Sequence, residues 1–205
     1  MKRIKLLLLT ALFPVLVFSQ GVELVPFAGY MFGGSVDYYE GKLKIENGMD
    51  YGISVLVPVQ YLVDLEINYT RMESNASFSP YIGYPNLSDV ETTVATNYFQ
   101  VGAISKLYRS DSKVTPFGSF SLGATWFTSS DFNDVWRFSM ALGLGVKIMF
   151  SERIGIMLRG RMLMPMFLGG VGIYGGTGGS GVSVNSVVAP LQGDFNGGLI
   201  IKIGN

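Results

Sequence analysis

The chain has 205 residues, of which 15% are charged and 27 are glycine, and its mean hydropathy is +0.36. Soluble domains carry about 25% charged residues, so this chain has too few charges for a fully solvated surface. Its 15 basic and 15 acidic residues cancel, which argues against nucleic acid as a partner. Cys and His are both absent, which excludes disulfides, thiolate or Ser-His-Asp catalysis, and metal sites built from these ligands. We therefore expect a non-enzymatic protein with no cofactor and no metal.

The first 19 residues have the pattern of a secretory signal peptide. Three basic residues near the start precede an apolar run over 6–18, and Ser19 is a small residue at the expected cleavage point. The alternative, a transmembrane anchor, needs about 20 apolar residues, which this run does not reach. We therefore expect residues 1–19 to be removed on export and residues 20–205 to form the mature domain.

Beyond the signal, apolar residues alternate with small or polar ones in one segment after another. In the clearest segment, 136–150, every even position is apolar, whereas the odd positions include Ser139 and Lys147. A period of two over such a length predicts one long strand with two different faces. In chain order the predicted strands are 23–34, 49–57, 63–70, 94–107, 114–126, 136–150, 154–162 and 195–203.

The connections between these segments alternate in length. Short turns are predicted at 58–61, 108–112 and 151–152, and longer loops at 34–42, 73–93, 128–135 and 165–192. Short turns at one end and long loops at the other are typical of a membrane barrel whose chain starts in the periplasm. The sequence thus predicts an all-β, eight-stranded antiparallel up-and-down transmembrane β-barrel.

Alternation alone fits a second architecture, a secreted lipocalin-like barrel whose apolar faces line a ligand cavity. The composition of the other face favours the membrane barrel. In segments 114–126 and 136–150 that face carries mostly Ser, Gly, Ala and Thr rather than the charged residues of a solvated surface. Small side chains suit the narrow lumen of an eight-stranded barrel. We therefore place the apolar face outside and the small and polar residues inside.

Aromatic residues are expected at two levels, as in the interfacial girdles of membrane barrels. Trp126 and Trp136 flank the same predicted loop. The other residues expected near that rim are Tyr30, Phe32, Tyr51 and Tyr69, and those expected near the short turns are Tyr61, Phe117 and Phe150. The alternative is that aromatic residues simply favour strands.

Three stretches resemble a known family: 25–30 (VPFAGY), 115–117 (TPF) leading to 121–123 (SLG), and the Gly-ended last strand. On these residues, and over 21–205, the chain resembles the small eight-stranded outer-membrane β-barrels of Gram-negative bacteria, akin to the barrel of outer-membrane protein A and to outer-membrane protein X. The resemblance implies residence in the outer membrane, with outer-membrane lipid, lipopolysaccharide and the barrel insertion machinery as partners.

The end of the chain departs from the pattern of that family. Many members end on a terminal aromatic that serves as an assembly signal, whereas this chain ends Ile203-Gly204-Asn205. We therefore expect recognition by the insertion machinery to use Phe195 and the apolar face of the last strand. The barrel enzymes of the outer membrane resemble this chain in architecture only, because their His-dependent sites have no counterpart here.

Charged residues at the alternate strand positions that point inward (inward parity) are expected to pair across the lumen. The acids are Glu23, Asp50, Asp64 and Glu66 on the first three strands, and the bases are Lys106, Arg137, Lys147, Arg159, Arg161 and Lys202 on the later strands. Unpaired buried charges are very costly, so we expect ion pairs that close the lumen. The alternative is an ion path or a proton relay.

The segment 170–175 matches G-x-G-x-x-G, with Asp194 following at a distance. A dinucleotide site needs a helix to open at the third glycine, and the glycine-rich sequence that follows predicts none. We interpret 169–181 as a flexible extracellular loop.

The sequence leads to one principal hypothesis and two alternatives. We expect a monomeric, non-enzymatic outer-membrane barrel that supports envelope structure or surface contact through its external loops, with its lumen plugged by side chains. The first alternative is a small pore or conduit for ions or apolar solutes. The second is the secreted ligand-binding barrel.

Overall fold

A computed structural model describes residues 21–37, 41–81, 89–107, 113–129, 134–176, 179–188 and 191–204. The predicted signal peptide therefore lies outside the described residues. The strands are β1 (Val22–Phe32), β2 (Ser35–Asp37), β3 (Gly41–Ile45), β4 (Gly48–Gln60), β5 (Val63–Pro80), β6 (Val90–Lys106), β7 (Val114–Ser129), β8 (Val135–Met149), β9 (Ile154–Gly176), β10 (Gly179–Val188) and β11 (Gln192–Ile203). No helix in this part of the chain is long and apolar enough to cross a membrane.

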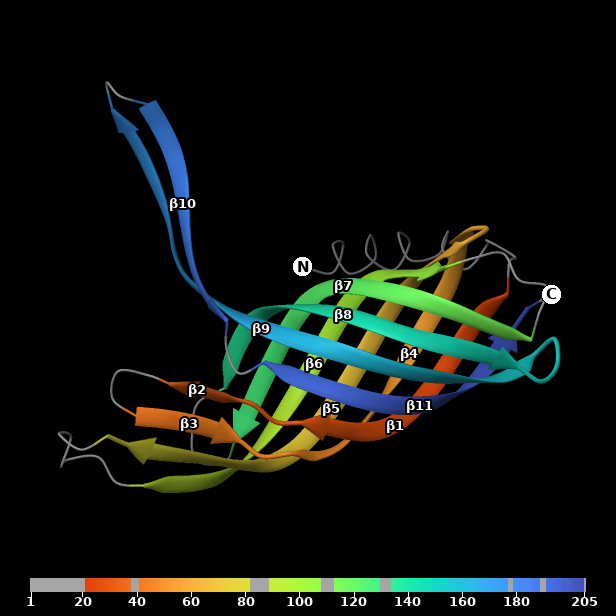
Figure 1. Ribbon diagram of the computed structural model, residues 1–205, viewed down its shortest axis with the longest axis horizontal. Helices are drawn as coiled ribbons and strands as arrows, with labels where there is room; N and C mark the ends of the chain where they lie inside the picture. The colour runs from red at the N-terminus through yellow and green to blue at the C-terminus, as the bar shows by residue number, and fades with distance from the viewer. Residues whose placement is uncertain are drawn as a thin grey trace, which may run out of the picture.

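Eight of these strands close into an antiparallel barrel (Figure 1). The order round the wall is β1, β4, β5, β6, β7, β8, β9 and β11. β11 returns to β1, where Val22 pairs with Ile203 at one end and Phe32 with Gly193 at the other. The wall has no open edge, so its backbone groups bond between strands, as a lipid environment requires. The predicted eight-stranded up-and-down barrel is confirmed.

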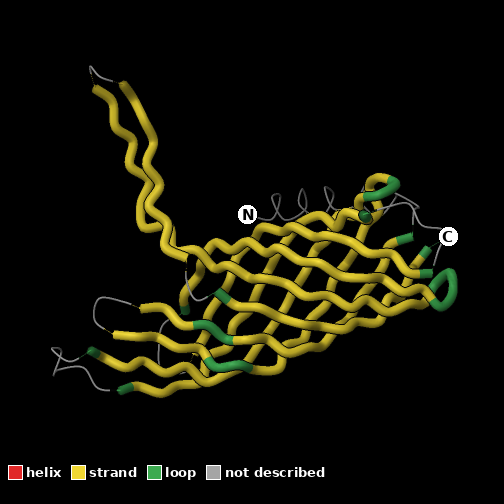
Figure 2. The backbone as a smooth tube through the Cα atoms, viewed as in Figure 1, coloured by secondary structure: helices red, strands yellow, loops and turns green. Residues whose placement is uncertain are grey.

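The two ends of the barrel differ as the loop lengths predict. The turns at 61–62 and 150–153 lie at the same end as both ends of the described chain, and the long excursions leave from the opposite end (Figure 2). We call these the turn end and the loop end. In a barrel whose chain starts in the periplasm, the turn end is periplasmic and the loop end extracellular.

Three of the four predicted long loops contain more strand than expected. Residues 34–42 contribute β2 and the start of β3, which form a hairpin whose β3 strand adds to the extension of β5. β5 continues to Pro80 opposite β6, so the predicted loop 73–93 is largely sheet. Within the predicted loop 165–192, the described residues up to Gly176 belong to β9 and residues 179–188 form β10, so they make a two-stranded ribbon instead of a flexible loop. These extensions arise because each hairpin continues the ladder already begun in the wall.

The apolar faces of the wall strands point outward. On β8, Trp136 is 54% exposed and Leu144 is 70% exposed, whereas Ser139 and Lys147 on the other parity are 0% and 3% exposed. Large exposed apolar side chains are found all round the barrel, from Ile53 on β4 to Leu199 on β11. Such an exterior suits lipid and would be unfavourable in water. The lipocalin-like alternative, with its apolar faces turned inward, is wrong.

The interior is less uniformly small and polar than the sequence predicts. One buried apolar cluster lies near the loop end (Met31, Ile45, Met72, Ala76, Tyr98, Ala141, Leu163), and another near the turn end (Val25, Leu56, Ile104, Phe117, Met157, Ile200). Phe117 is 1% exposed, so its expected place in the outer girdle is wrong. It points inward because it has the parity of Ser119 and Ser121, and the absence of a side chain at Gly145 leaves room for its ring.

Aromatic residues form a continuous contact series on the outer surface toward the loop end. The rings of Trp126 and Trp136 stack at 5.1 Å between centroids, and Phe99 links Trp136 to Tyr69. A second series joins Tyr30 to Phe32 and Phe32 to Phe195. Tyr51 is exposed on β4, and both Tyr61 and Phe150 are exposed beside the turns. Phe99 and Phe195 thus extend the aromatic set that the sequence suggests for this rim.

Candidate functional site

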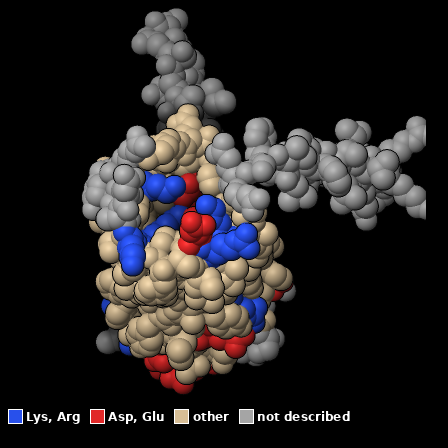
Figure 3. All heavy atoms as spheres, turned by 90° about the vertical axis from the view of Figure 1, so that its right-hand side faces the viewer, with Lys and Arg blue, Asp and Glu red and all other residues tan. Residues whose placement is uncertain are grey.

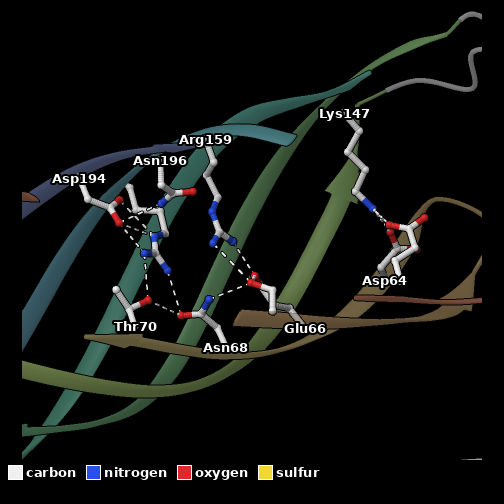
Figure 4. Close-up of polar contacts among 11 residues, drawn as sticks. Asp64, Glu66, Asn68, Thr70, Lys147, Arg159, Asp194 and Asn196 are labelled. Carbon is white, nitrogen blue, oxygen red and sulfur yellow. Dashed lines mark hydrogen bonds and ion pairs between the residues drawn. The ribbon is translucent and has the colours of Figure 1, made fainter. Parts of the chain in front are cut away.

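The lumen holds a buried polar layer between the two apolar clusters, and its central contact crosses the full width of the barrel (Figure 4). Arg159 Nη1 on β9 donates to Glu66 Oε1 on β5 at 2.5 Å. β9 and β5 are opposite walls, because β11, β1 and β4 separate them in one direction and β6, β7 and β8 in the other. Ser54 Oγ also donates to Glu66, at 2.8 Å. A single ion pair therefore ties opposite walls together.

Arg161 makes a second connection in the same layer. Its guanidinium pairs with Asp194 on the adjacent strand β11, and Nη1 donates to Asn68 Oδ1 at 2.9 Å on the opposite wall. Nη2 also donates to Thr70 Oγ1 at 3.1 Å. Asn196 Nδ2 donates to Asp194 Oδ2 at 3.0 Å. With so many donors engaged, Arg161 is held rigidly across the lumen.

Phe27 on β1 supports both arginines. The Cζ atoms of Arg159 and Arg161 lie 5.5 Å and 5.3 Å from the centroid of its ring, within the range of a cation–π contact. Phe27 is itself 5% exposed. One aromatic face thus stabilises two like charges that alternate along β9 and would otherwise repel each other.

A separate ionic cluster lies near the turn end. Lys147 Nζ donates to Glu23 Oε2 and to Asp64 Oδ2, each at 2.8 Å. Lys106 Nζ donates to the other oxygen of Asp64 at 2.9 Å. These contacts connect β8, β1, β5 and β6. Figure 3 looks onto this end of the barrel and shows Lys and Arg gathered around an acidic patch at its centre.

Not all of the predicted charges join these two groups. Asp50 is fully buried, but neither carboxylate oxygen has a hydrogen-bond partner among the described residues. Arg137 lies at the loop end of β8, where Nη1 donates to the carbonyl oxygen of Trp136. The stem of Lys202 lies beside Gly21 at the turn end.

The sequence reasoning missed Asp194 as a lumen residue. It shares the parity of Asn196 on β11, and this parity was the signal that could have identified it. Its partner Arg161 is on a neighbouring strand, so the acids and bases are not confined to opposite walls as expected.

Several other polar side chains in the outer half of the lumen are buried without a hydrogen-bond partner in the described part of the chain. Thr96 and Gln100 on β6, Thr125 on β7 and Ser139 on β8 form such a group on neighbouring strands. Between Thr96 and Gln100 on the same strand, Tyr98 donates its hydroxyl to Gln192 Oε1 on β11. Buried polar atoms of this kind are places where water can bind.

Neither a cluster of metal ligands nor a phosphate-binding helix is found in the described part of the chain. Among the described residues, no three or more His, Cys, Asp or Glu side chains are grouped so as to hold an ion. The G-x-G-x-x-G segment lies in the ribbon of β9 and β10, and no helix begins at its third glycine. It therefore lacks the helix N-terminus that a dinucleotide phosphate site uses.

Comparisons with solved structures show which fold this is. The chain is similar to neisserial surface protein A, with a TM-score of 0.58 and 15% identity over 89% of this chain and 97% of that one. It is also similar to the outer-membrane protein OprG from Pseudomonas aeruginosa, with a TM-score of 0.59 and 12% identity over 90% and 96%. The outer-membrane protein AlkL matches with a TM-score of 0.50 and 12% identity over 92% of each chain.

Comparisons of sequence gave no such match: no protein-family model and no curated protein matches the chain. The structural likeness shows the fold of small bacterial outer-membrane β-barrels. Together with the apolar exterior, this fold places the protein in the outer membrane.

Proposed function

We propose that this chain is a non-enzymatic outer-membrane barrel that works through surface contact by its external strands, while side chains keep its lumen closed. The observation that carries the proposal is the pair of ionic groups inside the barrel. Arg159 reaches Glu66 across the full width of the lumen, and Lys147 joins Glu23 and Asp64 nearer the turn end. The two apolar clusters lie on either side of the layer that holds Arg159 and Glu66.

The external strands offer the surface for contact. β2 and β3 extend the sheet formed by the outer parts of β5 and β6, and the ribbon of β9 and β10 projects beyond the wall (Figure 1). Surface segments positioned by a rigid scaffold are common sites of recognition. With a closed lumen, these extensions are the part of the molecule that remains available to a partner outside the cell.

The exterior of the wall suits the other proposed partners, which are outer-membrane lipid, lipopolysaccharide and the barrel insertion machinery. The exposed apolar belt contacts outer-membrane lipid, and the aromatic series at the loop-end rim lies where lipopolysaccharide meets the barrel. Phe195 is 69% exposed on the last strand, so it is available to the barrel insertion machinery. We propose that the spanning unit itself is monomeric.

Conductance in a planar bilayer tests the closed lumen. The purified mature protein should show no stable single-channel steps, because two ionic groups and two apolar clusters fill the path. A double variant, Glu66→Ala with Arg159→Ala, should produce steps, because it removes a contact that spans the lumen. The matched control is Arg71→Ala with Glu73→Ala, an exposed ion pair outside the lumen, which should stay silent. Reproducible steps from the unaltered protein would overturn the proposal.

Adhesion tests the role of the external strands. Cells that produce the protein are compared with cells that produce a variant in which residues 169–186 are replaced by a short turn. The variant should keep the heat-dependent gel shift of a folded barrel and lose adhesion to a surface or to other cells. Unchanged adhesion in the variant would contradict the proposed contact role.

One observation favours a second candidate, a narrow conduit. The polar atoms of Thr96, Gln100, Thr125 and Ser139 line neighbouring strands in the outer half of the lumen and have no hydrogen-bond partner among the described residues. Such a wall binds water and suits the passage of small ions more than that of apolar solutes. The same conductance measurement separates this candidate from the closed barrel.

A further inference from the structure

The ribbon of β9 and β10 has unusually open edges. Beyond Met166, which pairs with Phe138, β9 has β10 as its neighbour among the described strands, and β10 in turn pairs with β9 alone. The ribbon bends away from the barrel (Figure 1). An isolated two-stranded ribbon is marginally stable in water, and an open edge presents unpaired N–H and C=O groups to another strand. A further strand on the edge of β10 would satisfy these groups.

The sequence of the ribbon lacks the usual protection against such pairing. Residues 167–188 contain no Lys, Arg, Asp or Glu and no Pro. Natural edge strands are commonly blocked by charged residues or by proline. The edge therefore carries no charged residue or proline that would prevent another strand from pairing with it.

The sequence of β10 is also close to a palindrome. Residues 180–186 read S-G-V-S-V-N-S, so the order is the same from either end except for the exchange of Gly181 with Asn185. In an antiparallel pair of two such strands centred on Ser183, Val182 of each copy lies opposite Val184 of the other. Ser180 lies opposite Ser186, and Ser183 lies opposite itself. Cross-strand pairs of β-branched residues and of hydroxyl residues stabilise antiparallel sheets.

We propose that β10 is a self-association edge, which pairs antiparallel with β10 of a second copy of this chain about a two-fold axis at Ser183. The proposal rests on the proposed contact function and names its partner. A two-fold interface requires one patch that is complementary to itself, and the near-palindrome supplies it. The regular part of the edge ends at Asn185, where the pairing with β9 shifts register.

A second copy also suits the edge better than an unrelated peptide. A peptide recognised by strand addition is selected through its side chains, yet eight of the 13 positions over 169–181 are glycine and provide little such selection. Copies in one membrane share their orientation and can meet by lateral diffusion. The ribbons can then pair while each barrel remains a separate spanning unit.

Site-directed crosslinking tests the pairing, and the absence of native Cys makes every crosslink unambiguous. The variant Ser183→Cys, in outer-membrane vesicles under mild oxidation, should form a disulfide-linked dimer on a non-reducing gel, because the two residues lie opposite each other. Ser180→Cys alone should stay monomeric, because antiparallel strands place residue 180 away from its own copy. Glu152→Cys, exposed in the turn at the other end, controls for random collision.

The expected pattern is therefore a dimer for Ser183→Cys and none for the other two variants. A monomeric Ser183→Cys overturns the proposal, and so does equal crosslinking of Ser180→Cys, which would indicate parallel or non-specific contact. Adding Val184→Lys to Ser183→Cys should abolish the dimer by placing charges in the shared edge, whereas adding Val184→Thr should preserve it. The heat-dependent gel shift confirms that each variant is folded.

These results separate the self-association from the broader contact function. If Ser183→Cys stays monomeric but replacing residues 169–186 still abolishes adhesion, the pairing is wrong and the contact function stands. If the dimer forms but adhesion does not depend on the ribbon, the pairing stands and the proposed function is wrong.

Discussion

Arg159 and Glu66 hold opposite walls of the barrel together, with their side chains 0% and 4% exposed. β5 and β9 are not neighbouring strands, so the pair forms only when the sheet closes. Ser54 donates to the carboxylate of Glu66, and Asn68 in turn donates to Ser54 Oγ. The contact therefore links closure of the sheet to burial of charge, and several measurable consequences follow from this link.

The variant Glu66→Ala should be strongly destabilised. It leaves the Arg159 guanidinium buried without its partner, and removing one member of a buried ion pair costs about 3–5 kcal/mol. Urea unfolding of the protein in lipid vesicles, followed by tryptophan fluorescence, measures the loss. The matched control is Glu73→Ala, which breaks an exposed pair with Arg71 and should cost about 1 kcal/mol or less.

Removing both charges should largely restore this stability. The double variant Glu66→Leu with Arg159→Met replaces the ion pair by apolar side chains, a change that is often neutral in buried sites. The same unfolding assay should place it well above Glu66→Ala. If the double variant were as unstable as Glu66→Ala, an unpaired charge would not be the cause of the loss.

Phe27 should contribute more to the stability of the barrel than its size suggests. Phe27→Leu removes a ring that contacts two guanidinium groups, and buried cation–π contacts contribute about 2 kcal/mol. Measured by unfolding, its cost should exceed that of Phe120→Leu, a ring on the lipid-facing side. In a background that already carries Glu66→Leu and Arg159→Met, the cost of Phe27→Leu should fall. An unchanged cost there would contradict the cation–π contribution of Arg159.

Gly123 should not tolerate a side chain. A Cβ at this position would overlap the carbonyl oxygen of Phe99 and lie 2.7 Å from Cα of Gln100, so backbone of β6 would have to move. Overpacking of this kind costs about 1–3 kcal/mol. Gly118→Ala on the same strand is the control, because its nearest neighbour would be the Leu144 side chain at 3.7 Å. Folding yield and urea midpoint should fall for Gly123→Ala and change little for Gly118→Ala.

The two tryptophans should report on the outer aromatic rim. Trp136 is 54% exposed and stacks on the less exposed Trp126. In single-tryptophan variants made by Trp126→Phe or Trp136→Phe, lipids brominated along the acyl chain should quench Trp136 more strongly than Trp126. Soluble iodide should quench both weakly. Strong iodide quenching with no effect of brominated lipid would place these rings in water and contradict the membrane girdle.

Much of the architecture follows from residue order alone. A period of two along 136–150, repeated in other segments, determines which side chains share a face, and the alternation of turn and loop lengths determines the even strand number. The boundaries at the loop end were less predictable. β5 continues to Pro80 because the extended part of β6 pairs with it, and neither segment shows a strong apolar alternation of its own.

The lumen residues likewise combine features that the sequence predicts with features that only the structure shows. Inward parity identifies Glu66, Arg159 and Lys147 as lumen residues without any structure. Parity does not say which charges meet, because the shear of the barrel determines which levels of opposite walls face each other. Asp194 was missed for a different reason: the predicted last strand began at residue 195, whereas β11 begins at Gln192. Asp50 has the expected parity but ends without a hydrogen-bond partner in the described lumen.

The sequence by itself therefore determined the barrel, the direction of its apolar face and the set of residues available inside it. These properties depend on side-chain alternation, which is local. Only the tertiary structure decided the pairing of Arg159 with Glu66, the position of Phe27 beneath two arginines and the inward orientation of the Phe117 side chain. Those contacts join strands far apart in the chain, and their geometry exists only once the sheet has closed on itself.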